Sequence, residues 1–110
     1  MINYTTPTYP ITVENKDLTG QDVYVTFEQM GFKLTKSGED LTITTDTHDQ
    51  ITDTIITTSF TQKETAMFDP GTKVKVQVNF INSQGVRDAT NKATIEVFSN
   101  LLDKVIEYGN

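Results

Sequence analysis

The longest alternation in the sequence is Lys73-Val74-Lys75-Val76-Gln77-Val78-Asn79-Phe80-Ile81, and this stretch decides the fold class. Apolar residues at every second position point to one side of an extended chain, while the polar residues between them point to the other side. A period of two is typical of a β-strand with one buried face. The stretch therefore predicts a strand that packs one face against a hydrophobic core.

Other segments with strand character follow one another about every ten residues, a spacing that is typical of a sandwich or barrel. They are residues 9–14, 22–29, 32–36, 41–45, 54–60 and 87–98. Turn-forming residues separate them, such as Met30-Gly31 between the second and third segments. Pro10 has no backbone N–H to give to a neighbouring strand, so we expect the first strand to lie at a sheet edge.

The composition favours strands over helices throughout the chain. Twenty threonines, nine valines and nine isoleucines stand among the 110 residues, against five leucines and three alanines. β-Branched residues lose side-chain freedom in a helix and pack well on a pleated sheet. We therefore predict an all-β, immunoglobulin-like sandwich of two sheets with about seven to eight strands. It forms one domain over residues 1–110, with its core at about 8–98 and a tail at 99–110.

One short helical turn interrupts the strands near residues 61–68. The segment Thr61-Gln62-Lys63-Glu64 has the spacing of a capping box, in which the threonine hydroxyl and the glutamate carboxylate each accept a backbone N–H. We expect the turn to end at Phe68, with Met67 or Phe68 filling the end of the sandwich. Asp69-Pro70-Gly71 then forms a tight turn.

The tail from residue 99 to residue 110 has a helical pattern instead of an alternating one. Its apolar residues would share one helical face, with Ser99 or Asn100 as the N-cap and Gly109 as the stop. We predict a short C-terminal helix whose stripe is a protein interface. The stripe either packs across an open end of its own domain or docks onto a neighbouring subunit. Its residues are Leu101, Leu102, Val105 and Ile106.

Charge and residue types exclude several classes of function. Nine basic and fifteen acidic residues give a net charge of −6, which disfavours nucleic acid and anionic membranes as partners. There is no cysteine, and His48 is the sole histidine, so thiolate and two-histidine metal sites are excluded. No apolar run approaches a membrane span, and the first residues lack the pattern of a signal peptide. We expect no cofactor.

An acidic segment between the fourth and fifth strands is the candidate cation site. Asp46, Asp49 and Asp53, with the carbonyls of Thr47 and Gln50, offer oxygen donors within eight residues. Calcium takes six to eight oxygen ligands, but this spacing matches no EF-hand and has no glycine for a sharp turn. A solvated acidic loop is the default interpretation. A glycan-binding face, built on exposed tyrosines such as Tyr24, is the other alternative for a sandwich.

Catalytic residues are scarce. A serine nucleophile would need His48 as its base, and that histidine lies in the acidic segment. None of the four serines has the flanking glycines of a nucleophile elbow. Glycine-rich phosphate loops are also missing from the sequence. We therefore predict that the protein is not an enzyme.

A family resemblance begins in the segment Ser59-Phe60-Thr61-Gln62-Lys63-Glu64-Thr65-Ala66-Met67-Phe68-Asp69-Pro70-Gly71. A strand, the pattern T-x-x-E-T-x-x-F, a Pro-Gly turn and a long hairpin follow one another, and residues 23–29 match an earlier strand of the same layout. The arrangement resembles small β-sandwich domains of tailed phages and prophages of Gram-positive bacteria. One domain of this kind that it resembles is the N-terminal domain of phage baseplate upper proteins. The similarity covers roughly residues 8–98 and concerns layout rather than invariant motifs.

The resemblance implies a structural or assembly protein of a virion, with no catalytic residues to carry over. Its partners would be other virion or assembly proteins, with further copies of the same chain as one alternative. The protein would then be found in the virion or in the cytoplasm of the bacterial host. The acidic segment and the apolar tail are additions to the family's layout.

Overall fold

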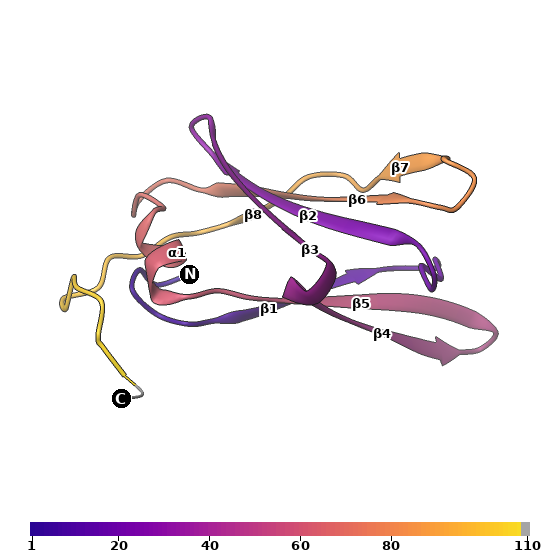
Figure 1. Cartoon of the computed structure of the whole chain (residues 1–110), viewed down its shortest axis with the longest axis horizontal. Coiled ribbons are helices and arrows are strands. Elements are labelled where there is room, and N and C mark those ends of the chain that lie inside the picture. The colour runs from indigo at the N-terminus through magenta and orange to yellow at the C-terminus, as the bar shows by residue number, and fades with distance from the viewer. Residues whose placement is uncertain (109–110) are drawn as a thin grey trace.

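The computed structural model describes residues 1–108 and has two antiparallel β-sheets packed face to face (Figure 1). The smaller sheet has the strand order β1-β5-β4, and the larger has β3-β2-β6-β7 with β8 also paired to β6. The predicted all-β sandwich is therefore confirmed. The strands are β1 Thr8–Val13, β2 Asp22–Gln29, β3 Phe32–Ser37, β4 Leu41–His48, β5 Ile51–Ser59, β6 Val74–Ile81, β7 Arg87–Ala89 and β8 Ala93–Ile95.

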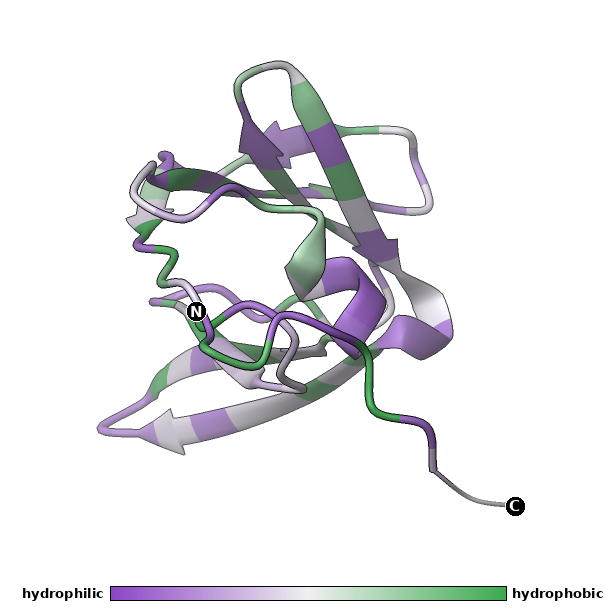
Figure 2. Cartoon of the chain, turned by 90° about the vertical axis from the view of Figure 1, so that its left-hand side faces the viewer, coloured by the Kyte–Doolittle hydropathy of each residue, from purple (hydrophilic) through white to green (hydrophobic). Residues whose placement is uncertain are grey.

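Alternation along the strands builds the core, as the bands of hydropathy in Figure 2 show. Along β2 and β6, every second residue is buried, and these side chains meet Ile56 of β5 from the opposite sheet. The rings of Phe27 and Phe60 cross edge to face, with their centroids 4.8 Å apart. Burying a side chain of this size contributes roughly 1.5–3 kcal/mol to stability. The sheets are therefore held together by one apolar layer that both of them supply.

Local turn chemistry sets the register of two hairpins. Met30 and Gly31 join β2 to β3, and both have positive φ, at 51° and 89°. Asp49 and Gln50 join β4 to β5 in the same way, with φ of 48° and 66°. Two residues with positive φ match the right-handed twist of the flanking strands. The Met30-Gly31 turn and the edge position of β1 are as predicted.

The acidic segment 46–53 is not a loop, which corrects the sequence prediction. β4 and β5 extend to His48 and Ile51, and Asp46 lies directly opposite Asp53 in the ladder. Composition suggested a loop because aspartates are rare in strands. The adjoining threonines and isoleucines, together with the two-residue turn, carry the hairpin to its tip.

The long return strand predicted for residues 87–98 is divided into β7 and β8. Between them, residues 90–92 lie opposite two residues of β6, so the strand contains a β-bulge of one extra residue. Thr90 replaces the missing ladder bond there, because its N–H donates to the Val78 carbonyl at 2.9 Å and its hydroxyl oxygen accepts the Val78 N–H at 3.1 Å.

The core also contains a residue of a connecting segment and two threonines of β5. Leu18 lies in the connection after β1 and packs into the hydrophobic core, and its backbone N–H donates to the Thr54 hydroxyl at 3.0 Å. The same hydroxyl donates to the Lys16 carbonyl at 2.8 Å. Thr54 and Thr58 are themselves fully buried. Threonine therefore serves the core of the smaller sheet as well as its wet face.

Candidate interaction site

The four residues predicted as an interface lie in the tail, which leaves the sandwich after Phe98 at the end that carries α1 (Figure 1). The tail has no helix between residues 99 and 108, so the predicted C-terminal helix is wrong. Gly109, its predicted stop, lies outside the described residues. The Asn100 side chain accepts the N–H of Leu102, two residues on, which forms a turn instead of a helix cap. A helix this short is also marginal in water without a packed face.

The apolar side chains of the tail are exposed to solvent. Leu101 is fully exposed, and Leu102 and Ile106 are 47% and 54% exposed. Val105 is partly buried against the domain. Tyr108 adds a further exposed ring, which the helical pattern of the sequence missed. Within the described residues, the structure therefore leaves most of the surface of the predicted interface residues exposed to solvent.

The domain anchors this tail through the side chain of Gln62. Its amide accepts the Ile106 N–H at 2.7 Å and donates to the Ile106 carbonyl at 3.0 Å, as a neighbouring strand would. Asn100 makes a second anchor, because its side chain donates to the Asn3 carbonyl at 3.0 Å. A groove of about 440 Å³ runs between Phe60–Lys63 and Val105–Tyr108. The backbone of the tail is therefore held by its own domain, while the apolar side chains of the tail stay exposed and can contact a partner.

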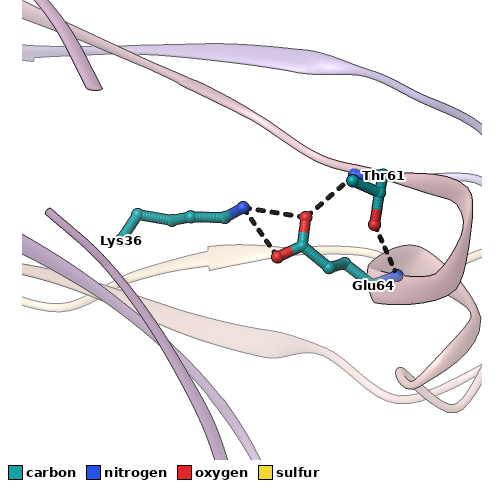
Figure 3. A network of polar contacts seen from close by, with 3 residues as sticks. All are labelled: Lys36, Thr61 and Glu64. Atoms are coloured by element: carbon teal, nitrogen blue, oxygen red, sulfur yellow. Dashed lines mark hydrogen bonds and ion pairs between the residues drawn. The ribbon is translucent and has the colours of Figure 1, made fainter. Parts of the chain in front are cut away.

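Gln62 is positioned by the short helix α1, Gln62–Ala66, whose cap is as predicted. The Thr61 hydroxyl accepts the Glu64 N–H at 3.2 Å, and the Glu64 carboxylate accepts the Thr61 N–H at 2.8 Å. Lys36 of β3 donates to both oxygens of the same carboxylate, at 2.8 and 2.7 Å (Figure 3). Phe68, not Met67, then fills the end of the sandwich. These contacts fix α1, and with it Gln62, to the edge of the larger sheet.

The carboxylate of Glu64 is the acidic group of this network. Burial raises the pKa of Glu64, but hydrogen bonds from Lys36 and Thr61 and the positive charge of Lys36 outweigh it. The resulting pKa lies below the ordinary value of a glutamate. Glu64 is therefore ionised at neutral pH and forms an ion pair with Lys36, which is itself buried.

The first residues of the chain close the same end, a role that the sequence did not indicate. Buried Asn3 donates from its side-chain amide to the carbonyls of Thr65 and Phe68, at 2.6 and 2.8 Å. Ile2 pairs in parallel with Phe98, next to the start of the tail. The base of the tail is therefore tied to the N-terminal segment and to α1 together.

The candidate calcium residues do not converge on one point. Asp46 and Asp53 face each other across β4 and β5, whereas Asp49 lies in the turn beyond them. Asp53 is engaged by the N–H of Asn15 at 2.8 Å. His48 lies 3.7 Å from Asp46 and 4.0 Å from Asp53. Within residues 1–108, no three histidine or acidic side chains are arranged to hold a metal ion.

A second hollow lies on the outer face of the larger sheet, where Tyr24 is exposed. It has a volume of about 410 Å³ and is lined by Tyr24, Thr26, Thr35, Asn79, Phe80, Ile81 and Arg87. The Arg87 guanidinium donates twice to the Asn79 side-chain oxygen, at 3.2 and 3.0 Å, so its position is fixed by that side chain. This surface combines one aromatic ring, hydroxyl groups and one cation.

Buried polar groups in the described part of the chain are all used structurally. Every buried side-chain nitrogen and oxygen there has a hydrogen-bond partner, so none is left aimed into a cavity. The surface features available for binding include the apolar tail, the two hollows described above and free strand edges. None of the helices described is long and apolar enough to cross a membrane. Comparison with known family models, with curated proteins and with solved structures found no match.

Proposed function

We propose that this protein is a non-catalytic structural or assembly component that acts through protein–protein contacts. The observation that carries the proposal is the tail, which presents exposed Leu101, Leu102, Ile106 and Tyr108 on a backbone anchored by Gln62. A contiguous exposed apolar patch marks an interaction site, and we infer that these four side chains, which lie within eight residues of one another, form such a patch. Because the backbone of the tail is already anchored, less conformational entropy is lost when a partner binds it.

A virion of a tailed phage or prophage of Gram-positive bacteria is the setting that we propose for this function. The sequence layout of residues 8–98 supports it, and the capping box of Thr61 and Glu64 is part of that layout. Symmetric assemblies multiply a small contact many times, so a short apolar tail on an acidic domain suffices. The protein would act in the virion, with baseplate or other assembly proteins as partners, or in the cytoplasm of the host before assembly.

We also propose that the sandwich is immunoglobulin-like. The strand order β1-β5-β4 corresponds to strands B, E and D of that fold, and β3-β2-β6-β7 corresponds to C′, C, F and G. The turn of α1 between β5 and β6 falls on the connection that crosses from one sheet to the other. The disulfide and the buried tryptophan of antibody domains have no counterpart, since the chain has neither cysteine nor tryptophan.

The tail is tested by a triple variant, L101S/L102S/I106S, compared with the full-length protein by light scattering at high concentration. We expect the unmodified chain to form a larger particle than the triple variant does, with the far-UV spectrum unchanged. V105S is the matched control, because Val105 is partly turned toward the domain. A monomeric full-length protein that the triple substitution does not alter would contradict self-association through the tail.

Glycan binding is the second candidate, and the hollow beside Tyr24 and Arg87 favours it. A tyrosine ring beside hydroxyl groups and a fixed guanidinium is the kind of surface that binds a sugar bearing a carboxylate. Binding of the protein to an array of acidic and neutral glycans tests this candidate, with Tyr24→Ala as the variant.

Titration calorimetry with calcium tests the cation alternative for Asp46, Asp49 and Asp53. A titration that releases or absorbs no heat of binding would exclude that alternative.

A further inference from the structure

β4 is an open edge of the smaller sheet. It pairs with β5 on one side only, and it runs along the outer margin of its layer in Figure 1. All of its residues after Leu41 are exposed. An edge strand presents unpaired N–H and C=O groups to which another strand can bind.

Each of the other edges carries a feature that blocks such pairing. On β1, Pro10 removes an N–H from the edge. On β3, Lys36 points its charge inward and Lys33 adds a second lysine at the edge. β7 and β8 are three residues each and are separated by the bulge. Natural sheets use these devices to prevent edge-to-edge association.

β4 has none of these devices. Its eight residues include no proline, lysine or glycine, and its pairing with β5 is continuous from Leu41 to His48. The two-residue turn makes His48 and Ile51 a hydrogen-bonded pair, so even-numbered residues of β4 bond to β5. Odd-numbered residues therefore point their backbone groups outward. Leu41 gives its N–H to the Gly38 carbonyl, which leaves its C=O and both groups of Ile43, Thr45 and Thr47.

We propose that β4 binds β4 of a second copy of this chain, antiparallel across a two-fold axis. Two three-stranded sheets would then join into one sheet of six strands. An identical strand is the occupant that the observations favour, because the outward groups are self-complementary when the axis passes through Thr44 or Thr45. The inference rests on the proposed function, since it names one partner and one surface for an assembly protein, but it does not involve the tail.

Charge selects between the two registers. With the axis at Thr45, the two copies of Asp46 become diagonal neighbours on one face, and their charges repel. With the axis at Thr44, Asp46 lies opposite Thr42 of the second copy, and His48 lies just beyond the start of its β4, where Asp40 ends the turn Gly38–Asp40. This register avoids two like charges directly opposite each other. We therefore assign the axis to Thr44, where the two threonines form a pair without hydrogen bonds, about 4.5 Å apart at Cα.

A contact made by one strand edge is small. It falls below the roughly 1,200 Å² that a stable interface buries, so we expect a weak dimer that a repeating assembly would reinforce. A covalent trap suits such a contact. The chain has no cysteine, so a single introduced cysteine reports on its own position. Cα atoms about 4.5 Å apart are within reach of a disulfide.

The experiment compares T44C, T45C and T12C under mild oxidation, in the otherwise unmodified full-length chain. We expect T44C to form a disulfide-linked dimer about ten-fold faster than T12C, which lies on the opposite edge of the same sheet. T45C faces Ile43 of the second copy, so we expect it to behave like T12C. Equal rates for T44C and T12C would overturn the proposal, and preferential linkage of T45C would overturn it as stated.

A proline variant tests the non-covalent dimer. Thr45→Pro removes an outward N–H and leaves every bond from β4 to β5 in place, so the fold should survive. In the L101S/L102S/I106S background, which removes association through the tail, sedimentation at high concentration should show a dimer when β4 is unmodified and a monomer when T45P is added, with T45K as a second variant if the proline unfolds the domain. A dimer that both variants retain would refute the edge pairing. Repeating T44C in the L101S/L102S/I106S background separates the edge from the tail, because linkage there survives a failure of the tail alone.

Discussion

Removing one partner of the Lys36–Glu64 pair should be far more damaging from one side than from the other. The Lys36 side chain is 9% exposed and the Glu64 side chain is 21% exposed. Glu64→Gln leaves the ammonium group of Lys36 buried beside the Phe60 ring with no counter-charge. Breaking a buried pair in this way lowers the free energy of unfolding by about 3–5 kcal/mol. Because Glu64 is partly exposed, we expect a loss near the lower end of that range, about 3 kcal/mol.

Lys36→Met has a milder outcome. The Glu64 carboxylate then keeps its hydrogen bond from the Thr61 N–H and has some access to water, so we expect a loss of about 1 kcal/mol. The double variant K36M/E64Q buries neither charge. It should therefore lie within about 1 kcal/mol of the unmodified protein and be more stable than E64Q.

Urea unfolding followed by far-UV circular dichroism at neutral pH measures these three variants. In a domain of this size, 1 kcal/mol corresponds to roughly 4 °C, so E64Q should also unfold about 12 °C lower on heating. K63M is the matched control, since Lys63 is exposed on the same helix. Equal losses for K36M and E64Q, or losses that simply add in the double variant, would refute the assigned roles of burial and charge.

Three further predictions concern the end of the sandwich and its pH dependence, all measured by reversible unfolding. Phe68→Ala should cost about 3–5 kcal/mol because it empties the core, while Met67→Ala, at a 57% exposed position, should cost less than about 0.5 kcal/mol. Asn3→Ala should cost about 2 kcal/mol, since two carbonyls lose their donors, and a neutral result would contradict its bonds. The lowered pKa of Glu64 means that its stabilisation is complete above the ordinary glutamate value of about 4.3 and is lost as the pH falls through the folded-state pKa. E64Q should therefore lose less stability than the unmodified chain between neutral and acidic pH.

Features that depend on neighbours within a few residues could be predicted from the sequence. The alternation of β6, the Met30-Gly31 turn and the capping box of Thr61 and Glu64 all follow from local chemistry, and the structure has each of them. The edge position of β1 followed from Pro10, because a missing N–H excludes the middle of a sheet. These elements are enough to define a β-sandwich.

The candidate site depended on contacts that no local pattern contains. Lys36 meets Glu64 across 28 residues, and Asn3 reaches Phe68 across 65, so only the folded chain brings them together.

The tail shows most clearly where prediction from local sequence fails. Its apolar spacing matches one helical face, but a helix of that length needs a packed surface, and Gln62 offers the Ile106 backbone a strand-like partner instead. Residue type and spacing determined the fold class, most of the strands and which residues are apolar, but not the strand ends within residues 46–53 or the division of β7 from β8. Tertiary structure decided which of those residues stay exposed, because burial depends on what the rest of the chain places beside them.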